Sequence, residues 1–102
     1  MIADVSSRLE ELRELCRRFH VRRLDLFGSG ARNDFDSARS DLDFLVEFEP
    51  LPDGAYADAF FGLKESLERL FARPVDLIAA TAIRNPFFRE SVERLKASVY
   101  AA

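Results

Sequence analysis

The sequence predicts an α/β (α+β) fold, a short mixed β-sheet backed by helices in the order α-β-loop-β-α-β-α. Segments with an apolar residue every three or four positions alternate with short segments in which every second residue is apolar. A helix-bearing crossover separates the second and third predicted strands, which is the length that parallel neighbours require. The 102 residues are 48% hydrophobic, enough for the core of a single domain over 1–102.

Composition and charge argue against several classes of protein. No apolar run approaches the roughly 20 residues of a membrane span, and the N-terminus has no signal-peptide pattern. The single cysteine, Cys16, can form neither an internal disulfide nor a zinc site. The formal net charge of -3 does not suit a protein that coats phosphates. We therefore expect a cytoplasmic protein with no membrane partner and no direct nucleic-acid binding.

The first third of the chain reads as helix, strand and loop. An apolar stripe with spacings of four, three, four and three predicts a helix from about residue 4 to 19 and places Cys16 in the core. A short strand follows at Leu24–Phe27 and ends at Gly28. Residues 28–40 are rich in Gly, Ser, Asn and Asp, which predicts a loop.

The rest of the chain alternates strand and helix. Alternating apolar residues predict a strand over 41–48, and Pro50, Pro52 and Gly54 then interrupt the pattern. A second helix carries apolar residues from Tyr56 to Phe71, and a third strand spans Val75–Ile78. A last helix is expected after Pro86, with its apolar face formed by Phe88, Val92, Leu95 and Val99.

Three aspartates are candidate metal ligands. Asp41 and Asp43 are two apart on a predicted strand, so both side chains point to one face, roughly 6–7 Å apart. Two carboxylates placed so closely need a compensating cation, and Mg²⁺ takes one or two carboxylates together with phosphate oxygens. Asp76 begins the next strand in an apolar setting. If the two strands are neighbours, Asp76 joins the pair, and three carboxylates can hold two metals roughly 4 Å apart.

A glycine-rich turn follows the first predicted strand directly. In Gly28-Ser29-Gly30 the glycines allow backbone N–H groups to approach a phosphate, and the Ser29 hydroxyl adds a donor. By itself Gly-Ser-Gly is a common turn. It is neither a P-loop nor a dinucleotide-binding fingerprint.

Together these segments resemble the minimal nucleotidyltransferases of the DNA polymerase β superfamily. The resemblance rests on Phe27-Gly28-Ser29, Ala31-Arg32, Ser40-Asp41-Leu42-Asp43-Phe44-Leu45-Val46 and Val75-Asp76-Leu77. It extends to Arg84-Asn85-Pro86-Phe87-Phe88 and a following helix that ends at Tyr100. One departure is that eleven residues separate Ser29 from Asp41, where the superfamily usually has ten.

The resemblance implies a small nucleotidyltransferase fold and a magnesium-dependent reaction. Members transfer a nucleoside monophosphate from a nucleoside triphosphate and release pyrophosphate. Carried over, Gly28, Ser29 and Arg32 would bind the triphosphate of ATP, and Asp41, Asp43 and Asp76 would hold two Mg²⁺ ions. Asp76 would also assist deprotonation of the acceptor hydroxyl.

The resemblance further implies a partner protein. Small stand-alone members are commonly antitoxins of a HEPN/MNT toxin–antitoxin pair, in which some transfer AMP to a tyrosine of the HEPN ribonuclease. We therefore expect an adenylyltransferase that works in a hetero-oligomer with a HEPN-type toxin. Two alternatives stay open: a non-catalytic antitoxin that acts by contact alone, and a nucleotidyltransferase for a small molecule with a separate acceptor subunit.

Overall fold

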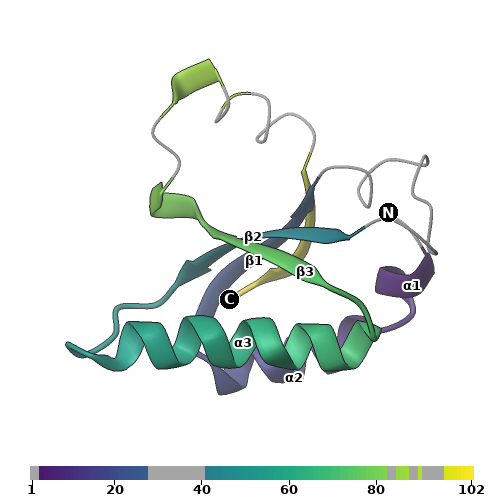
Figure 1. Cartoon of the computed structure of the whole chain (residues 1–102), viewed down its shortest axis with the longest axis horizontal. Coiled ribbons are helices and arrows are strands. Elements are labelled where there is room, and N and C mark those ends of the chain that lie inside the picture. The colour runs from purple at the N-terminus through teal and green to yellow at the C-terminus, as the bar shows by residue number, and fades with distance from the viewer. Residues whose placement is uncertain (1–2, 28–40, 83–84, 88–89, 91–95) are drawn as a thin grey trace.

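A four-stranded mixed sheet with helices on one of its faces organises the chain (Figure 1). The computed structural model describes residues 3–27, 41–82, 85–87, 90 and 96–102. The spatial order is β3-β2-β1-β4, with β1 antiparallel to β2 and β4 and with β2 parallel to β3. The α/β class and the parallel pairing across the crossover are thus confirmed. The strands are β1 (Val21–Phe27), β2 (Leu42–Phe48), β3 (Val75–Ala79) and β4 (Ala97–Ala101).

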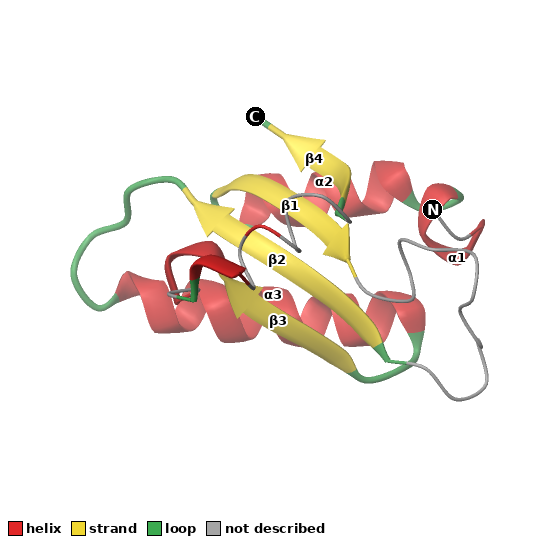
Figure 2. Cartoon of the chain, turned by 90° about the horizontal axis from the view of Figure 1, so that it is seen from above, coloured by secondary structure: helices red, strands yellow, loops and turns green. Residues whose placement is uncertain are grey.

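Two helices, α2 (Leu9–Arg18) and α3 (Ala55–Phe71), lie under the same face of the sheet (Figures 1 and 2). The short helix α1 (Ala3–Ser6) precedes α2, and a 3₁₀ turn, η2 (Ala80–Ala82), follows β3. Acidic residues in the first turn of α2 and basic residues in its last turn complement the helix dipole. Within the described ranges, no helix has the length and apolar character that crossing a bilayer requires.

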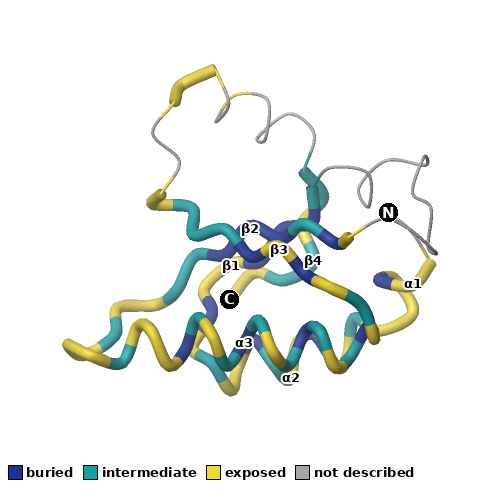
Figure 3. The backbone as a smooth tube through the Cα atoms, viewed as in Figure 1, coloured by how far each residue is buried: buried dark blue, intermediate teal, exposed yellow. Residues whose placement is uncertain are grey.

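The hydrophobic core lies between the sheet and these helices (Figure 3). The aromatic rings of Phe44 on β2 and Phe71 at the end of α3 stack with centroids 6.1 Å apart. Cys16 is fully buried among these residues, as its place on the apolar stripe predicts, and burial raises the pKa of its thiol to about 12. Other residues with no exposed surface are Val5, Leu12, Leu24, Leu26, Leu42, Leu63 and Leu67. One face of the sheet therefore packs against α2 and α3, so a site on the sheet must lie on the opposite face.

Three predicted boundaries were wrong. The helix expected over 4–19 is divided at Ser7 and Arg8 into α1 and α2. The first strand begins at Val21, three residues before the predicted start. The last helix was expected to continue to Tyr100, but Ala97–Ala101 form β4, which pairs with β1 and adds a fourth strand to the sheet. Most of the segment expected to be helical after Pro86 lies outside the described residues.

Left-handed backbone residues flank α3. Gly54 precedes the helix with φ 84°, and Ala72 follows it with φ 54°. Glycine adopts this conformation without cost, whereas a Cβ atom makes it unfavourable by roughly 1–2 kcal/mol. Ala72 therefore carries backbone strain at the turn that leads into β3.

Replacing Ala72 with Gly is expected to stabilise the fold. Relief of the strain outweighs the extra entropy of the unfolded glycine, leaving a net gain of about 0.5–1 kcal/mol. Chemical denaturation of both proteins measures this difference. Ala59→Gly is the matched control, because Ala59 lies beyond the first turn of α3 and its replacement should destabilise by at least a similar amount. Loss of stability in both variants would contradict the assignment of strain to Ala72.

Candidate active site

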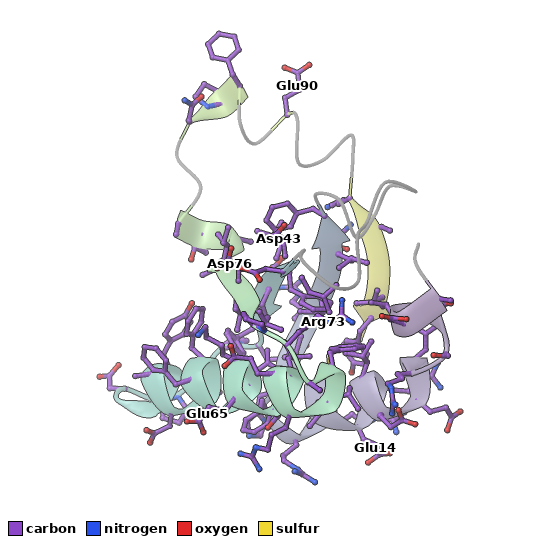
Figure 4. All side chains as sticks on the ribbon, turned by 45° about the vertical axis from the view of Figure 1, so that its right-hand side comes forward. Glu14, Asp43, Glu65, Arg73, Asp76 and Glu90 are labelled. Carbon is purple, nitrogen blue, oxygen red and sulfur yellow. The ribbon has the colours of Figure 1, made fainter. Side chains whose placement is uncertain are left out.

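Two carboxylates meet on the open face of the sheet, where β2 and β3 begin. Asp43 and Asp76 are direct partners in the parallel register, and neighbouring strands lie about 4.8 Å apart. Their neighbours Leu42 and Val75 are buried toward the helices, so the alternation of the strands turns both aspartates the other way. Figure 4 shows the two labelled side chains next to each other on the side away from α3.

The pKa of Asp43 shows how closely the two carboxyl groups interact. It rises from 3.8 to about 6 because Asp43 is partly desolvated, forms a side-chain hydrogen bond with Asp76 and is repelled by the charges of Asp76 and Asp41. A hydrogen bond between two carboxyl groups requires that they share a proton. The two carboxyl groups therefore repel each other when both are ionised.

A set of polar contacts fixes the start of β3 and hence the position of Asp76. The backbone N–H of Val75 donates to Glu68 Oε2 on α3 at 3.2 Å, and Lys64 Nζ lies 3.8 Å from Glu68 Oε1. The backbone N–H of Leu42 donates to Pro74 O at 3.3 Å, which joins the beginnings of β2 and β3. These contacts connect the neighbour of Asp76 to α3 and to β2.

The chain turn before β3 is also linked to the N-terminal helix. Arg73 Nη2 lies 3.0 Å from Asp4 Oδ2, and Arg73 Nε donates to Phe71 O at 3.5 Å. Arg73 thus connects α1 to the segment between α3 and β3. The beginning of β3 is held from both sides.

Asp41 is placed differently from the other two aspartates. It is exposed, immediately precedes β2 and contributes repulsion at Asp43. Among the residues that the structure describes, no three carboxylate, imidazole or thiol side chains gather as a potential metal-ligand cluster. The structure therefore brings Asp43 and Asp76 together and leaves Asp41 at the margin of the pair.

The Asp43–Asp76 pair fits a divalent cation by its donor chemistry. Mg²⁺ prefers oxygen ligands and is commonly bound by one or two carboxylates, with substrate phosphates completing its coordination. The raised pKa of Asp43 shows that ionising both carboxylates together costs free energy. A bound cation would lower this cost. The other predicted nucleotide ligands, Gly28, Ser29 and Arg32, lie outside the described residues.

A buried ion pair on the same face was not anticipated from the sequence. Asp25 of β1 pairs in register with Leu45, two residues along β2 from Asp43. Its carboxylate lies 3.4 Å from Lys96 Nζ, and the two side chains are only 3% and 9% exposed. Arg23 Nε, on a more exposed side chain, lies 3.2 Å from the same carboxylate.

Asp25 and Lys96 could have been suspected from two signals. Asp25 interrupts an otherwise apolar run, Leu24-Asp25-Leu26, and Lys96 is one of only two lysines in the chain. Glu47, on the same face of β2 as Asp43, instead forms an ion pair with Arg22 at 3.7 Å. Within the described residues, the charged groups on this part of the face therefore form ion pairs, whereas Asp43 and Asp76 lie against each other.

Comparison with known proteins identifies the family to which these features belong. The family model described as "Nucleotidyltransferase domain" matches residues 9–99. A candidate protein adenylyltransferase from Methanocaldococcus jannaschii is 34% identical over 93 residues, which cover 90% of this chain and 91% of that protein. The solved structure of a candidate minimal nucleotidyltransferase is 35% identical, with a TM-score of 0.75 and coverage of 90% and 89%.

A more distant structure shares the fold alone. A chain from the complex of a tri-AMPylated Shewanella oneidensis HEPN toxin with its MNT antitoxin superimposes with a TM-score of 0.64 at 17% identity. The match covers 95% of this chain and 72% of that one. The family match and the relatives above 30% identity confirm the resemblance seen in the sequence. The chain belongs to the nucleotidyltransferase domain family and is an enzyme of the minimal nucleotidyltransferase group in the DNA polymerase β superfamily.

Proposed function

We propose that this enzyme transfers AMP from ATP to a tyrosine hydroxyl of a HEPN-type ribonuclease toxin and thereby acts as its antitoxin. The observation that carries the proposal is the Asp43–Asp76 pair, whose register on parallel strands places two carboxylates side by side on the face of the sheet opposite α2 and α3. The similarity to a candidate protein adenylyltransferase supports AMP as the transferred group. The shared fold with a chain of the MNT–HEPN complex supports the partner and the antitoxin role.

The carboxylates and the glycine-rich turn have separate tasks in the proposed reaction. Asp43 and Asp76, with Asp41 beside them, would hold Mg²⁺. Bound Mg²⁺ supplies positive charge that neutralises the triphosphate as it reacts, and most of the catalysis in such transfers is positioning and charge stabilisation. Gly28, Ser29 and Arg32 would bind the triphosphate, as the family resemblance implies.

The bond changes follow from this arrangement. The acceptor oxygen forms a bond to the α-phosphorus of ATP, and the bond from that phosphorus to the β-phosphate bridging oxygen breaks. Pyrophosphate leaves with the electron pair of that bond. The hydroxyl proton passes to Asp76, which is the more exposed carboxylate of the pair. We place this reaction in the cytoplasm, where ATP and Mg²⁺ are abundant.

The proposal is tested with the purified chain, ATP, Mg²⁺ and the protein encoded by the neighbouring open reading frame, which the proposal expects to be the HEPN-type toxin. Pyrophosphate release that depends on the HEPN protein, together with loss of its ribonuclease activity, is the expected result. Inhibition of the ribonuclease without pyrophosphate release would instead identify an antitoxin that acts by contact. Pyrophosphate release with a small hydroxyl compound and none with the HEPN protein would identify a small-molecule enzyme.

Replacing Ser29 with Ala is expected to weaken ATP binding. A hydrogen bond to a charged group contributes roughly 1.5–3 kcal/mol, which corresponds to about a 10- to 100-fold rise in Kd. Isothermal titration calorimetry with ATP and Mg²⁺ measures the change. The matched control is Ser66→Ala on α3, where Ser66 lies in the groove between α2 and α3. Equal ATP affinities for wild type and Ser29→Ala would remove Ser29 from the site.

A further inference from the structure

An apolar groove runs between α3 and β3, the outer strand on this side of the sheet. It has a volume of about 570 Å³. Of the three large hydrophobic side chains that the described part of the chain exposes, Phe61 (60% exposed) and Tyr56 (44%) lie in it. We call this surface the aromatic groove; its principal residues are Tyr56, Phe60 and Phe61 of α3, Ile78 of β3, and Ala82 of η2.

The aromatic side chains of the groove support one another. Tyr56 packs edge-on against Phe48 with centroids 5.3 Å apart and stacks on Phe60 at 6.2 Å. Phe60 in turn contacts Phe61 edge-on at 5.3 Å. Rings held in this way lose little conformational freedom when another surface covers them, which is typical of the anchor residues of protein interfaces.

Ile78 of β3 links the groove to the strand that carries Asp76. Ile78 and Asp76 are two residues apart on β3 and so point to the same face, about 7 Å apart along the strand. This separation is comparable to the length of an extended tyrosine side chain. A protein whose tyrosine hydroxyl reaches Asp76 from beyond the outer strand would therefore have its backbone and neighbouring side chains over Ile78 and the aromatic groove.

The lining of the groove indicates which component of the reaction it receives. The triphosphate of ATP is polyanionic and needs charged or N–H donors, whereas the groove is formed by aromatic and aliphatic side chains. We propose that the aromatic groove is the docking surface for the acceptor protein and receives an apolar patch next to the modified tyrosine. This inference rests on the proposed function and names the surface that selects the partner.

Binding of the protein from the neighbouring open reading frame, which the proposed function expects to be the HEPN toxin, tests the inference without requiring catalysis. Phe61→Gln removes an exposed ring and adds no charge, so it should fold normally and raise the Kd of the complex about tenfold in calorimetry. Ala82→Arg, at an exposed position on the η2 side of the groove, should have a similar effect. Phe87→Gln is the matched control, since Phe87 is 80% exposed and lies outside the groove.

Steady-state transfer separates the acceptor from the nucleotide. We expect Phe61→Gln to raise the KM for the HEPN protein about tenfold, with the KM for ATP and kcat at saturating acceptor unchanged. A raised KM for ATP would assign the groove to the adenine base and overturn the inference. An unchanged Kd for the HEPN protein, or an equal loss in Phe87→Gln, would also overturn it.

The outcomes distinguish this inference from the proposed function. Binding that Phe61→Gln weakens, in a complex that transfers no AMP, would support the docking surface and contradict the proposed transferase activity. AMP transfer that Phe61→Gln leaves unaffected would support the activity and contradict the docking surface. Absence of any complex between the wild-type proteins would contradict the inference itself.

Discussion

Replacing Asp43 with Asn is expected to lower AMP transfer by at least about 10²–10³-fold while leaving the fold intact. The substitution removes one of two adjacent carboxylates proposed to bind Mg²⁺, and the amide that replaces it carries no charge. Pyrophosphate release in the presence of the HEPN protein measures the effect. Asp58→Asn is the matched control, because Asp58 is an exposed residue of α3 and the same chemical change is made away from the site. This variant should retain full activity. A transfer rate that is equal in Asp43→Asn and wild type would rule out the proposed role of Asp43.

The same variant should gain stability, with a defined dependence on pH. The folded-state pKa of Asp43, about 6, lies above its ordinary value of 3.8, so the folded protein binds the proton more tightly than the unfolded chain. The contribution of Asp43 to stability is therefore fully present below pH 3.8 and is lost as pH rises to about 6. At pH 7 the ionised carboxylate destabilises the fold, by about 1–2 kcal/mol once its partial exposure to solvent is taken into account.

Thermal unfolding in EDTA at a series of pH values tests whether ionised Asp43 destabilises the fold. Asp43→Asn should melt several degrees above wild type at pH 7, since 1 kcal/mol corresponds to about 4–8 °C in a domain of this size. The advantage should shrink as pH falls below about 6 and disappear only below about pH 3.8, where Asp43 is protonated in both the folded and the unfolded state. If Asp43→Asn is less stable than wild type at pH 7, the ionised carboxylate of Asp43 does not destabilise the fold.

Replacing Lys96 with Met is expected to destabilise the protein by about 2–4 kcal/mol. Asp25 is almost completely buried, and removing one partner of a buried ion pair leaves a charge that the interior solvates poorly. Arg23 stays beside Asp25, which keeps the loss below that of a fully orphaned carboxylate. Urea denaturation at pH 7 measures the difference.

A double-mutant cycle isolates the ion pair from other effects of the substitution. Asp25→Leu with Lys96→Met should recover most of the lost stability, because an apolar pair of similar volume replaces the buried charges. Arg69→Met is the exposed control: Arg69 forms a pair with Glu65 in which both side chains are more than two thirds solvent-accessible, at 79% and 72%. If Lys96→Met costs no more than Arg69→Met, the Asp25–Lys96 pair does not stabilise the fold.

Local sequence pattern was sufficient for the elements that form the carboxylate pair. Alternating apolar residues around Asp43 predict its strand, and the helical period from Tyr56 to Phe71 predicts the helix of the crossover. The apolar residues around Asp76 predict the next strand. The length of the crossover then implies parallel neighbours, and this is the pairing that the structure has. The adjacency of Asp43 and Asp76 could therefore be expected before the structure was known.

The features that were predicted wrongly or missed, β4 and the Asp25–Lys96 pair, depend on contacts between residues far apart in the sequence. Phe88, Val92, Leu95 and Val99 follow a helical period, yet Val99 lies in β4, where hydrogen bonds to β1 override that local pattern. The buried position of Asp25 depends on Lys96, which is distant in sequence and reaches it only because β4 pairs with β1. Neither feature can be derived from a short window of residues.

The mass of the HEPN protein after co-expression tests the central claim most directly. The protein from the neighbouring open reading frame, which the proposed function expects to be the HEPN toxin, is produced with wild-type enzyme and, separately, with Asp43→Asn, and the intact mass of each chain is measured. We expect the HEPN protein to gain the mass of one or more AMP groups with wild type and none with Asp43→Asn, and we expect peptide mapping to place these groups on tyrosine. An unmodified HEPN protein in both samples, or equal modification in both, would contradict it.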